Sequence, residues 1–385
     1  MRHENTVFHG LLKLVPWPQF KELVKKHEMD AGVRGLTTKS QFIAMLFAQL
    51  AGSASLRDLT TTLESHPAML YHAGGKVVRR STLADANRDR SHAFFDELFA
   101  AVLARSQTGL PRKMRQAVRL IDSTSLRLSS LSSAWARFSK DVFGAKLHVV
   151  YALDEERPVY FALTPANVND ITPAKSIAIE GGATYVFDLG YYDFAWWAAL
   201  DAQGCRIVTR FKSNTPLAVV AENVVPNGQD FILCDRIGHL PARLTYARKN
   251  PMQDPVREIC IRIETGKILR LLTNDLDAPA RDIADLYKSR WQIELFFRWI
   301  KQMLKIKRFL GTSENAVRIQ VAVALIAFLL LRMAHRLFAF EGKPLTFARL
   351  VRATLTHRRS LAELLHPPKP SPQSKNQMIM ELAPC

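Results

Sequence analysis

The sequence predicts an α/β fold in which a helical N-terminal region precedes a mixed β-sheet. A change in hydrophobic period supports this prediction. Residues 7–110 repeat apolar side chains at helical spacing, whereas short apolar segments typical of strands begin near residue 117. With 385 residues, the chain is long enough for two or three domains and for a core that needs no disulfides.

The composition is that of a globular protein. Hydrophobic residues make up 48% and charged residues 23%, which excludes disordered, collagenous and coiled-coil chains. The four cysteines are scattered without a C-x-x-C pair, so we expect neither a disulfide scaffold nor a zinc ribbon. No signal-peptide core is found, and the longest apolar run, 321–331, is shorter than the roughly 20 residues that span a bilayer. We therefore expect a cytoplasmic protein with no membrane partner.

The net charge of +18 predicts a polyanionic partner, most often nucleic acid. The chain has 53 Lys and Arg against 35 Asp and Glu, and residues 296–385 alone carry 15 basic and four acidic side chains. A second basic block lies in the N-terminal region. It contains Lys76, Arg79, Arg80, Arg88 and Arg90. A generally basic, solvated surface is the alternative explanation.

The N-terminal region alternates helical patterns with short glycine-containing turns between residues 38 and 90, which is compatible with a helix-turn-helix. Arginines crowd the last of these helices, and we predict that Arg79, Arg80 and Arg88 contact DNA. A plain helical bundle is the alternative. The predicted helical N-terminal DNA-binding domain covers residues 1–112.

Three strands in series, followed by alternating helices and strands, indicate an RNase H-like sheet. The five predicted strands cover residues 117–126, 145–154, 158–164, 183–190 and 205–212. Helices are expected at 172–180 and 193–202.

Residues 213–276 interrupt this alternation with short strand patterns of mixed charge, which predict a β-rich insertion. A long helix begins near residue 278, so the RNase H-like core would comprise 113–212 and 277–312. An apolar helix and a basic helical stretch form a predicted C-terminal helical basic region, 313–366. Residues 367–385, which begin PPKPSP, are expected to be a disordered tail.

Two aspartates end predicted strands that would lie side by side. Asp122 ends the first strand and Asp188 ends the fourth. In an RNase H-like order these strands are neighbours, so both carboxylates would face one another where open α/β sheets bind ligands. Two carboxylates so close repel unless a cation lies between them, and Mg²⁺ is the natural choice. A capping or turn role for each aspartate is the alternative.

The long helix places a third acid within a cationic stripe. The stripe consists of Tyr287, Arg290, Glu294, Arg298, Lys301 and Lys305. Tyr287, Arg290, Glu294 and Lys301 have offsets of 0, 3, 7 and 14, which at 3.6 residues per turn fall within about 60° of one another. Apolar residues occupy the opposite side of the helix. A carboxylate beside several cations stays charged, as a metal ligand must. A surface salt-bridge stripe is the alternative.

Tyr287, Arg290, Glu294 and Lys301 match the Y-(2)-R-(3)-E-(6)-K signature. On these residues the chain resembles the DDE transposases of bacterial insertion sequences, in particular insertion-sequence family four. The segments LIDSTSL, VFDLGYYD and LYKSRWQIELFFRWIKQMLKIKRFLG also look like that family. The resemblance covers most of the chain, including the N-terminal helical region. It implies an RNase H-like core with a β-rich insertion and two divalent metal ions.

The resemblance implies a catalytic, metal-binding triad of Asp122, Asp188 and Glu294. Tyr287, Arg290 and Lys301 become contacts to DNA ends, and Arg298 and Lys305 extend that DNA-binding stripe. The implied activity is transposition, in which water nicks the transposon end and the freed 3′-hydroxyl then joins target DNA. Mg²⁺, with Mn²⁺ as the alternative, is the expected cofactor. The expected partners are terminal inverted repeats, target DNA and a second copy of the chain, as a homodimer on DNA.

Three alternatives remain beside the transposase. A hydrolytic nuclease of the same fold would cut without joining, a DNA-binding protein would need no triad, and a degenerate copy would be inactive. One departure from the family concerns aromatic residues. Some relatives place a tryptophan in the insertion, where it stacks on a base flipped out at a hairpin end, but none of the six tryptophans lies within 213–276. Phe231 and Tyr246 are the candidate replacements.

Overall fold

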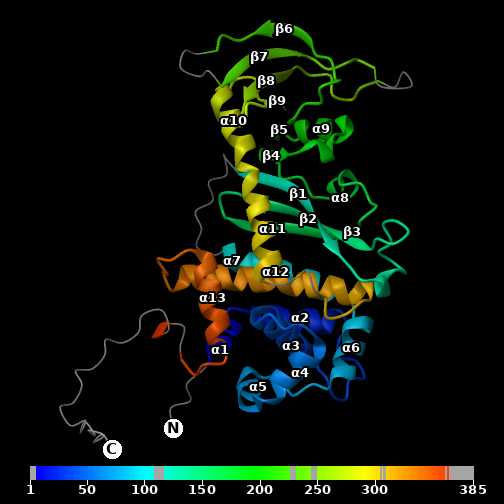
Figure 1. The fold of residues 1–385 in the computed structure, drawn as a ribbon, viewed down its shortest axis with the longest axis vertical. Coiled ribbons are helices and arrows are strands. Elements are labelled where there is room, and N and C mark those ends of the chain that lie inside the picture. The colour runs from blue at the N-terminus through cyan, green and yellow to red at the C-terminus, as the bar shows by residue number, and fades with distance from the viewer. Residues whose placement is uncertain are drawn as a thin grey trace, which may run out of the picture.

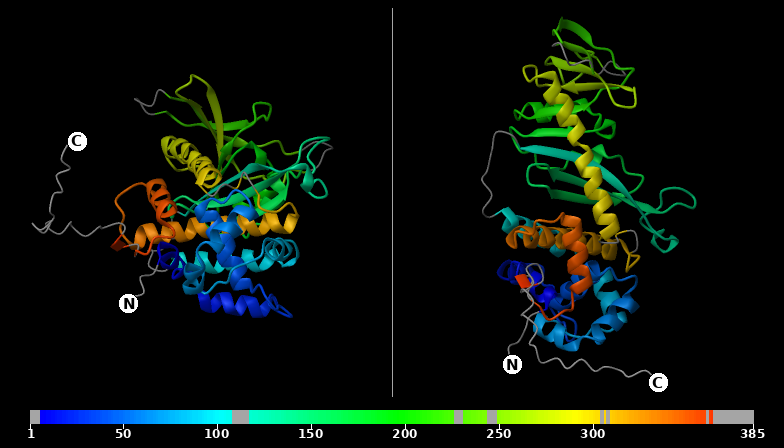
Figure 2. Two further views of the ribbon diagram at one scale, coloured as in Figure 1. Left: turned by 60° about the horizontal axis from the view of Figure 1, so that its bottom comes forward. Right: turned by 60° about the vertical axis from the view of Figure 1, so that its left-hand side comes forward.

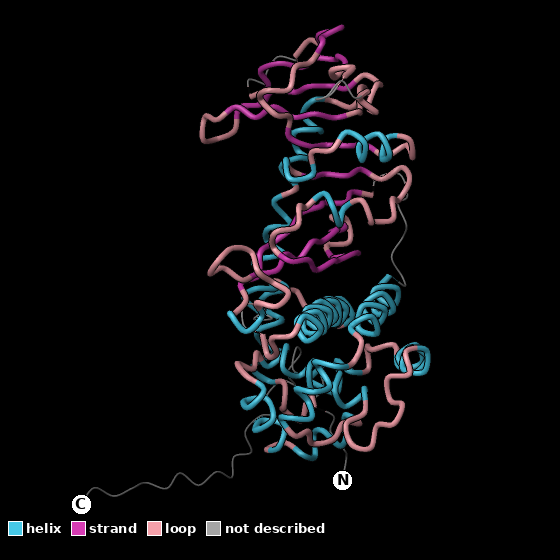
Figure 3. The backbone as a smooth tube through the Cα atoms, turned by 90° about the vertical axis from the view of Figure 1, so that its right-hand side faces the viewer, coloured by secondary structure: helices cyan, strands magenta, loops and turns pink. Residues whose placement is uncertain are grey.

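The computed structural model describes residues 6–107, 117–225, 231–243, 249–303, 306, 309–359 and 362–363. Helices gather at one end of the molecule and strands at the other (Figure 1). The backbone tube shows the same division, with the strands stacked above the layer of helices (Figure 3). The predicted tail, 367–385, lies outside the described residues.

The described residues 6–107 form helices and contain no strand. The helices are α1 (Val7–Leu12), α2 (Trp17–Lys26), α3 (Thr38–Ala51), α4 (Leu56–Glu64), α5 (Pro67–Ala73), α6 (Arg80–Asp89) and α7 (His92–Gln107). The hydroxyl of Thr37 caps α3 by accepting from Ser40 N, and Gly52, with φ of +73°, ends it in the left-handed conformation. Helix α3 is buried along nearly its whole length, so it forms the centre of this helical layer.

The C-terminal helices α12 (Glu314–Leu337) and α13 (Pro344–Thr354) join the N-terminal helices in that layer (Figure 2). Asn315 of α12 accepts from His92 N at 3.1 Å and donates to Asn87 O at 3.0 Å. By length and composition α12 is apolar enough to cross a membrane, but 83% of its apolar window is buried inside the protein. Helix α12 is thus a core helix of the helical layer.

The described strands form one nine-stranded sheet in the order β3-β2-β1-β4-β5-β9-β8-β7-β6. The strands are β1 (Val118–Arg127), β2 (Gly144–Ala152), β3 (Arg157–Pro165), β4 (Thr184–Phe187), β5 (Arg206–Arg210), β6 (Ala218–Glu222), β7 (Ile232–His239), β8 (Val256–Arg262) and β9 (Ile268–Thr273). Strand β1 is antiparallel to β2 and parallel to β4, and β4 is parallel to β5. The predicted adjacency of the first and fourth strands is confirmed.

The strands of the predicted insertion extend the same sheet, because β9 pairs antiparallel with β5. The sequence patterns indicated β7, β8 and β9. They did not indicate β6, which is an exposed edge strand with no buried side chain and therefore no alternating pattern. Most of the predicted strand 242–248 lies outside the described residues.

Helices cover both faces of the sheet. Helices α10 (Ala280–Ser289) and α11 (Trp291–Met303) run end to end along one face toward the helical layer (Figure 2). On the other face lie α8 (Ile171–Ala174), α9 (Phe194–Asp201) and the short 3₁₀ helix η3 (Leu189–Tyr191), whereas η2 (Ser130–Ser132) follows β1. Strand alternation sets the two faces, because Leu120 packs with α10 and α11 while Ile121 packs with α9.

The predicted helix at 172–180 is wrong beyond its first turn. Helix α8 ends at Ala174, and residues 178–180 have no regular secondary structure. Glu180 forms an ion pair with Arg119 of β1 at 2.8 Å, and Gly181 and Gly182 follow. This long-range ion pair holds the segment along the sheet.

Candidate active site

Asp122 and Asp188 come from neighbouring strands. Asp188 directly follows β4, as predicted, but Asp122 lies inside β1, which continues to Arg127. The parallel register pairs Leu120 with Val186, so two residues further along, Asp122 is level with Asp188. The same two-residue step places both on the sheet face that α10 and α11 cover.

The helix that carries Glu294 is interrupted at Arg290, contrary to the prediction of one continuous helix. Arg290 N donates to Tyr287 O and Ile293 N donates to Arg290 O, each at 3.1 Å and each a tight i→i−3 bond. Tyr287 therefore ends up on α10, where it is only 9% exposed, and burial raises its pKa.

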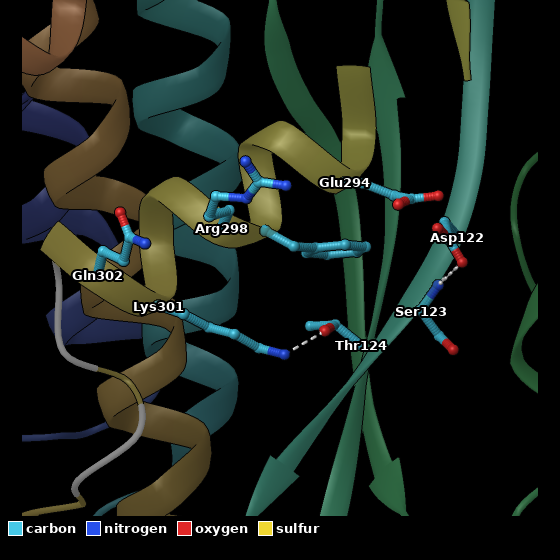
Figure 4. A pocket seen from close by; sticks show the side chains of 8 residues that line it. Asp122, Ser123, Thr124, Glu294, Arg298, Lys301 and Gln302 are labelled. Carbon is cyan, nitrogen blue, oxygen red and sulfur yellow. Dashed lines mark hydrogen bonds between the residues drawn. The ribbon is translucent and has the colours of Figure 1, made fainter. Parts of the chain in front are cut away.

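A pocket of about 420 Å³ opens between β1 and α11 (Figure 4). Its lining residues are Asp122, Ser123, Thr124, Glu294, Phe297, Arg298, Lys301 and Gln302. The side chain of Glu294 points across the pocket toward Asp122, and Lys301 Nζ donates to Thr124 Oγ1 (Figure 4). The pocket thus combines two carboxylates with two cations.

Arg290 ties the strand acid to the helix acid. Its Nη1 atom donates to Asp122 Oδ2 at 3.1 Å, and its Nη2 atom donates to Glu294 Oε1 at 2.7 Å. The side chains of Arg290 and Asp122 are 18% and 16% exposed, so this bridge is largely shielded from water. One guanidinium therefore holds residues that are 172 positions apart near each other.

Burial raises the pKa of Asp122 to about 6. The Ser123 N–H, which donates to Asp122 Oδ1 at 2.8 Å, and Arg290 act in the opposite direction, while Asp188 and Glu294 raise the pKa further. Mutual repulsion of carboxylates at a shielded site is the condition that a hard divalent cation relieves, and carboxylate oxygens are its preferred ligands.

The described side chains hold no group of three or more His, Cys, Asp or Glu already arranged to bind a metal. Asp188 Oδ1 instead accepts from Gly190 N at 2.8 Å and caps the turn after β4. Asp188 is also absent from the lining of the 420 Å³ pocket.

The other predicted DNA contacts lie in different surroundings. Arg298 is exposed beside the Trp291 ring, 5.9 Å from its centroid, and Lys305 lies outside the described residues. Arg79 and Arg80 are exposed at the start of α6. Arg88, also on α6, forms ion pairs with Asp85 at 3.0 Å and Asp89 at 2.7 Å.

A second pocket, of about 660 Å³, lies between α10, α11 and the strands that extend the sheet. Phe231, one of the two candidate replacements for an insertion tryptophan, lines this pocket with Tyr287 and Trp291. Tyr246, the other candidate, lies outside the described residues. Trp291 is 49% exposed, and the sequence interpretation missed it although it directly follows Arg290.

A third pocket, also about 660 Å³, lies among α1, α2, α3 and α5. Lys13, Lys39 and Trp17 line it together with Tyr71, whose side chain is 80% exposed. Burial lowers the pKa of His9 in its wall, and Lys13 and Lys39 lower it further. These residues were missed because helical spacing alone does not reveal which cations lie next to aromatic rings.

A family model described as the transposase DDE domain matches residues 113–330, more than half of the chain. The chain belongs to this family. This transposase is therefore an enzyme that cleaves and transfers DNA. A second model, described as a domain of unknown function (DUF4372), matches residues 3–76.

Curated relatives agree with the family. The transposase is 42% identical to y4zB of Sinorhizobium fredii, which is named as a transposase, over 76% of this chain and 82% of the relative. It is 27% identical to a protein of Geobacillus stearothermophilus named as a transposase for insertion sequence element IS5377, over 66% and 67% of the two chains. It is 31% identical to transposase InsG for insertion sequence element IS4 of Escherichia coli, over 22% and 21%.

Among solved structures, a chain of a piggyBac transposase synaptic complex with hairpin DNA aligns with 96% of this chain and 81% of its own length. The TM-score is 0.42 and the identity 11%, so this likeness is too low to support a conclusion.

Proposed function

We propose that this transposase cuts and joins transposon ends by DDE phosphoryl transfer, with Asp122, Asp188 and Glu294 as its metal-binding catalytic carboxylates. The observation that supports this proposal is the convergence of three elements. Glu294 of α11 and Asp122 of β1 share Arg290, and the β1–β4 register makes Asp188 level with Asp122.

The core that carries these acids is RNase H-like and comprises residues 113–212 and 277–312. The strand order supports this assignment, since three antiparallel strands are followed by two strands parallel to the first. Residues 213–276 are its β-rich insertion. Residues 1–112 and 313–366 form the N-terminal DNA-binding domain and the basic helical region.

The acids fit Mg²⁺, with Mn²⁺ as the alternative, because they offer carboxylate oxygens at a site where burial disfavours the negative charge of Asp122. Two bound ions would supply Lewis-acid stabilisation of both the attacking and the leaving oxygen. Asp188, which caps the turn after β4, would have to turn toward Asp122 to bind them, and Arg290 would have to share or release Asp122 and Glu294. Once released, Arg290 is placed to donate to phosphate oxygens.

DNA is held by cations around the catalytic pocket and on the helical layer. Arg298 and Lys301 line the catalytic pocket, and with Lys305 they continue the stripe along the DNA end. Because transposition joins two terminal inverted repeats to one target, we expect a homodimer on DNA. Affinity should fall steeply with salt, as it does when Lys and Arg displace counterions from phosphates.

The N-terminal helices contribute contacts of two kinds. Arg79 and Arg80 are exposed at the start of α6. The pocket among α1, α2, α3 and α5 combines Lys13 and Lys39 with exposed Tyr71, a pairing of cation and aromatic ring that suits a nucleic-acid strand.

Charge-removing variants of the acids test this mechanism. Asp122→Asn, Asp188→Asn and Glu294→Gln should each abolish nicking of the transposon's own end yet keep its binding, because each removes a metal-binding charge at nearly constant shape. Glu314→Gln is the matched control, since Glu314 also pairs with an arginine four residues away at 2.7 Å. A variant that still nicks at a near-wild-type rate does not belong to the site.

Strand joining distinguishes this mechanism from that of a hydrolytic nuclease. A pre-cut end with a 3′-hydroxyl, given Mg²⁺ and a supercoiled plasmid, should become covalently joined to the plasmid. The same end with a 3′-dideoxy nucleotide should bind equally well and not join. Tight binding of pre-cut ends without joining, alongside turnover on uncut ends, would favour the nuclease.

A further inference from the structure

The sheet face behind Asp122 carries a polar cluster that the proposed mechanism does not use. Ser123 follows Asp122 in β1 and therefore points to the opposite face. His148 of β2 lies directly across from Ser123, and Lys146 lies across from Ser125. Ser123, Lys146 and His148 thus share one face and surround a single acid, Asp170, which directly precedes α8.

Asp170 connects β1 to β2. Its Oδ1 atom accepts from Ser123 Oγ at 3.1 Å and from Lys146 Nζ at 3.0 Å. His148 Nδ1 is 3.8 Å from the same oxygen. The side chain of Asp170 is 23% exposed and that of Lys146 22%, so this pair is partly shielded from water and stronger than a typical surface pair.

The other oxygen of Asp170 lies against the turn that follows Asp188. A side chain at Gly190 would place its Cβ 3.0 Å from Asp188 Oδ1 and 3.1 Å from Asp170 Oδ2. The two oxygens flank the same point and are therefore at most 6.1 Å apart. Glycine at this position allows both carboxylates to approach the same stretch of backbone.

The charges of Lys146 and Asp170 affect how well a cation can bind at the neighbouring catalytic acids. Lys146 places a positive charge on the strand next to Asp122, and Asp170 neutralises it. Without that carboxylate, the Lys146 ammonium would oppose a divalent cation at the neighbouring catalytic acids. Asp170 also accepts a hydrogen bond from Ser123, next to Asp122, and lies against the turn that follows Asp188.

We propose that Asp170 is a positioning residue for the catalytic acids. Through Ser123 and the Gly190 turn it fixes Asp122 and Asp188 relative to each other, and through Lys146 it keeps the local charge favourable for Mg²⁺. This inference rests on the proposed function, which assigns metal binding to the two aspartates. Removal of a residue that supports metal ligands typically lowers metal affinity about 10–100-fold.

Asp170→Asn tests the proposal in the full chain, with two readouts. The first is the rise in Tm that Mg²⁺ causes, titrated without DNA, and the second is the Mg²⁺ concentration that gives half-maximal nicking. Both should need about 10–100-fold more Mg²⁺. The Tm without metal and the binding of end DNA without metal should stay close to wild type.

Asp193→Asn is the matched control, because Asp193 pairs with Lys175 at 2.6 Å and is 25% exposed but touches neither catalytic strand acid. Combining Asp170→Asn with Lys146→Met should restore part of the Mg²⁺ response, since the unpaired cation is then gone. If Asp170→Asn unfolds the protein, Ser123→Ala removes one of the two bonds to Asp170 Oδ1 and should raise the Mg²⁺ requirement by a smaller factor.

Two results would overturn the proposal. One is an Asp170→Asn titration that coincides with that of Asp193→Asn. The other is a lower Tm and weaker DNA binding without metal, at an unchanged Mg²⁺ requirement, which would mean that Asp170 only stabilises the fold. Failure of the proposed function gives a different pattern, because Asp122→Asn would then keep the full Mg²⁺-dependent rise in Tm.

Discussion

The cations of α11 and those of α6 are similar in sequence and different in structure. Arg290 beside α11 and Lys301 on it reach across to acceptors on β1, at Asp122 and Thr124. Arg88 on α6 pairs instead with acids of its own helix, and its side chain is 60% exposed.

The difference lies in where the partner of each cation comes from. In general, an exposed ion pair within one helix contributes roughly 0–1 kcal/mol to stability and is screened by salt. Such a pair therefore does not hold the cation at one position. A shielded cation with a partner from a distant strand is held at one place in the fold. Charge density along the sequence therefore indicates a basic protein, whereas long-range partners indicate which cations belong to a site.

The largest expected effect concerns the α11 side of this comparison. Arg290→Gln removes the cation shared by Asp122 and Glu294, so nicking of end DNA should fall at least about 100-fold, the usual cost of losing one preorganised electrostatic contact. Arg88→Gln should change the nicking rate by less than about threefold, because its partners are local and exposed. Single-turnover nicking at saturating protein measures the rates of both variants. Similar losses in the two variants would contradict the difference between the shielded cation and the exposed one.

Sequence patterns were sufficient for the order of the first five strands and for the position of Asp188. Those strands are short apolar runs whose order follows from the alternation of helix and strand. The patterns failed where long-range contacts decide the structure. The segment 178–180, predicted as helix, has no regular secondary structure, and Glu180 pairs there with Arg119, whereas the predicted first strand, 117–126, agrees with β1 to within one residue at each end.

For the candidate site, the sequence predicted which residues of the stripe lie near one another better than it predicted the geometry around them. Spacing placed Arg290 and Glu294 on one helix face, and the structure joins them at 2.7 Å. Spacing could not reveal the interruption at Arg290, which depends on two i→i−3 bonds, nor the contact between Asp170 and Ser123, which are 47 residues apart. Periodicity describes one element at a time, so contacts between elements escape it.

The second prediction concerns a buried titratable group on β2, the strand that pairs with β1 beside Asp122. Burial lowers the pKa of His148 from 6.5 to about 4; Asp170 opposes this shift and Lys146 adds to it. Between these values the unfolded chain binds more protons than the folded chain, so the free energy of unfolding falls as pH decreases through this range. This histidine should account for about 2 kcal/mol of the loss between pH 7 and pH 5.

His148→Asn removes that contribution. Urea unfolding at pH 7 and pH 5 should give a difference between the two pH values that is smaller in the variant than in wild type. Carboxylates titrate in both proteins and cancel in the comparison. An unchanged difference would mean that His148 is not the group that senses acid.

The third prediction measures one phosphate contact at the catalytic pocket. Lys301→Ala should reduce the slope of log K against log salt for end DNA by about 0.9, the value for one lost phosphate contact. Helix content by circular dichroism should not change, because the neighbouring Ile300 carries the core face of α11. Gln302→Ala is the control, since Gln302 lines the same pocket without a charge. A lost helix with an unchanged slope would make Lys301 structural.

The smallest expected effect separates two surfaces of the N-terminal helices. Lys39 Nζ lies 4.9 Å from the centroid of the Trp17 ring, in the pocket that Lys13 and Tyr71 also line. Among the described residues, no acid forms an ion pair with Lys13 or Lys39. If this pocket follows the DNA backbone, Lys13→Ala and Lys39→Ala should each lower the salt slope by up to about 0.9. Two variants outside this pocket serve as controls. Arg88→Ala should lower the salt slope by much less, because Asp85 and Asp89 already balance its charge.

Lys26→Ala is the second control, since Lys26 pairs with Glu97 at 2.7 Å. A larger effect at Arg88 than at Lys39 would show that its local ion pairs open on DNA, and α6 would then be the N-terminal contact surface.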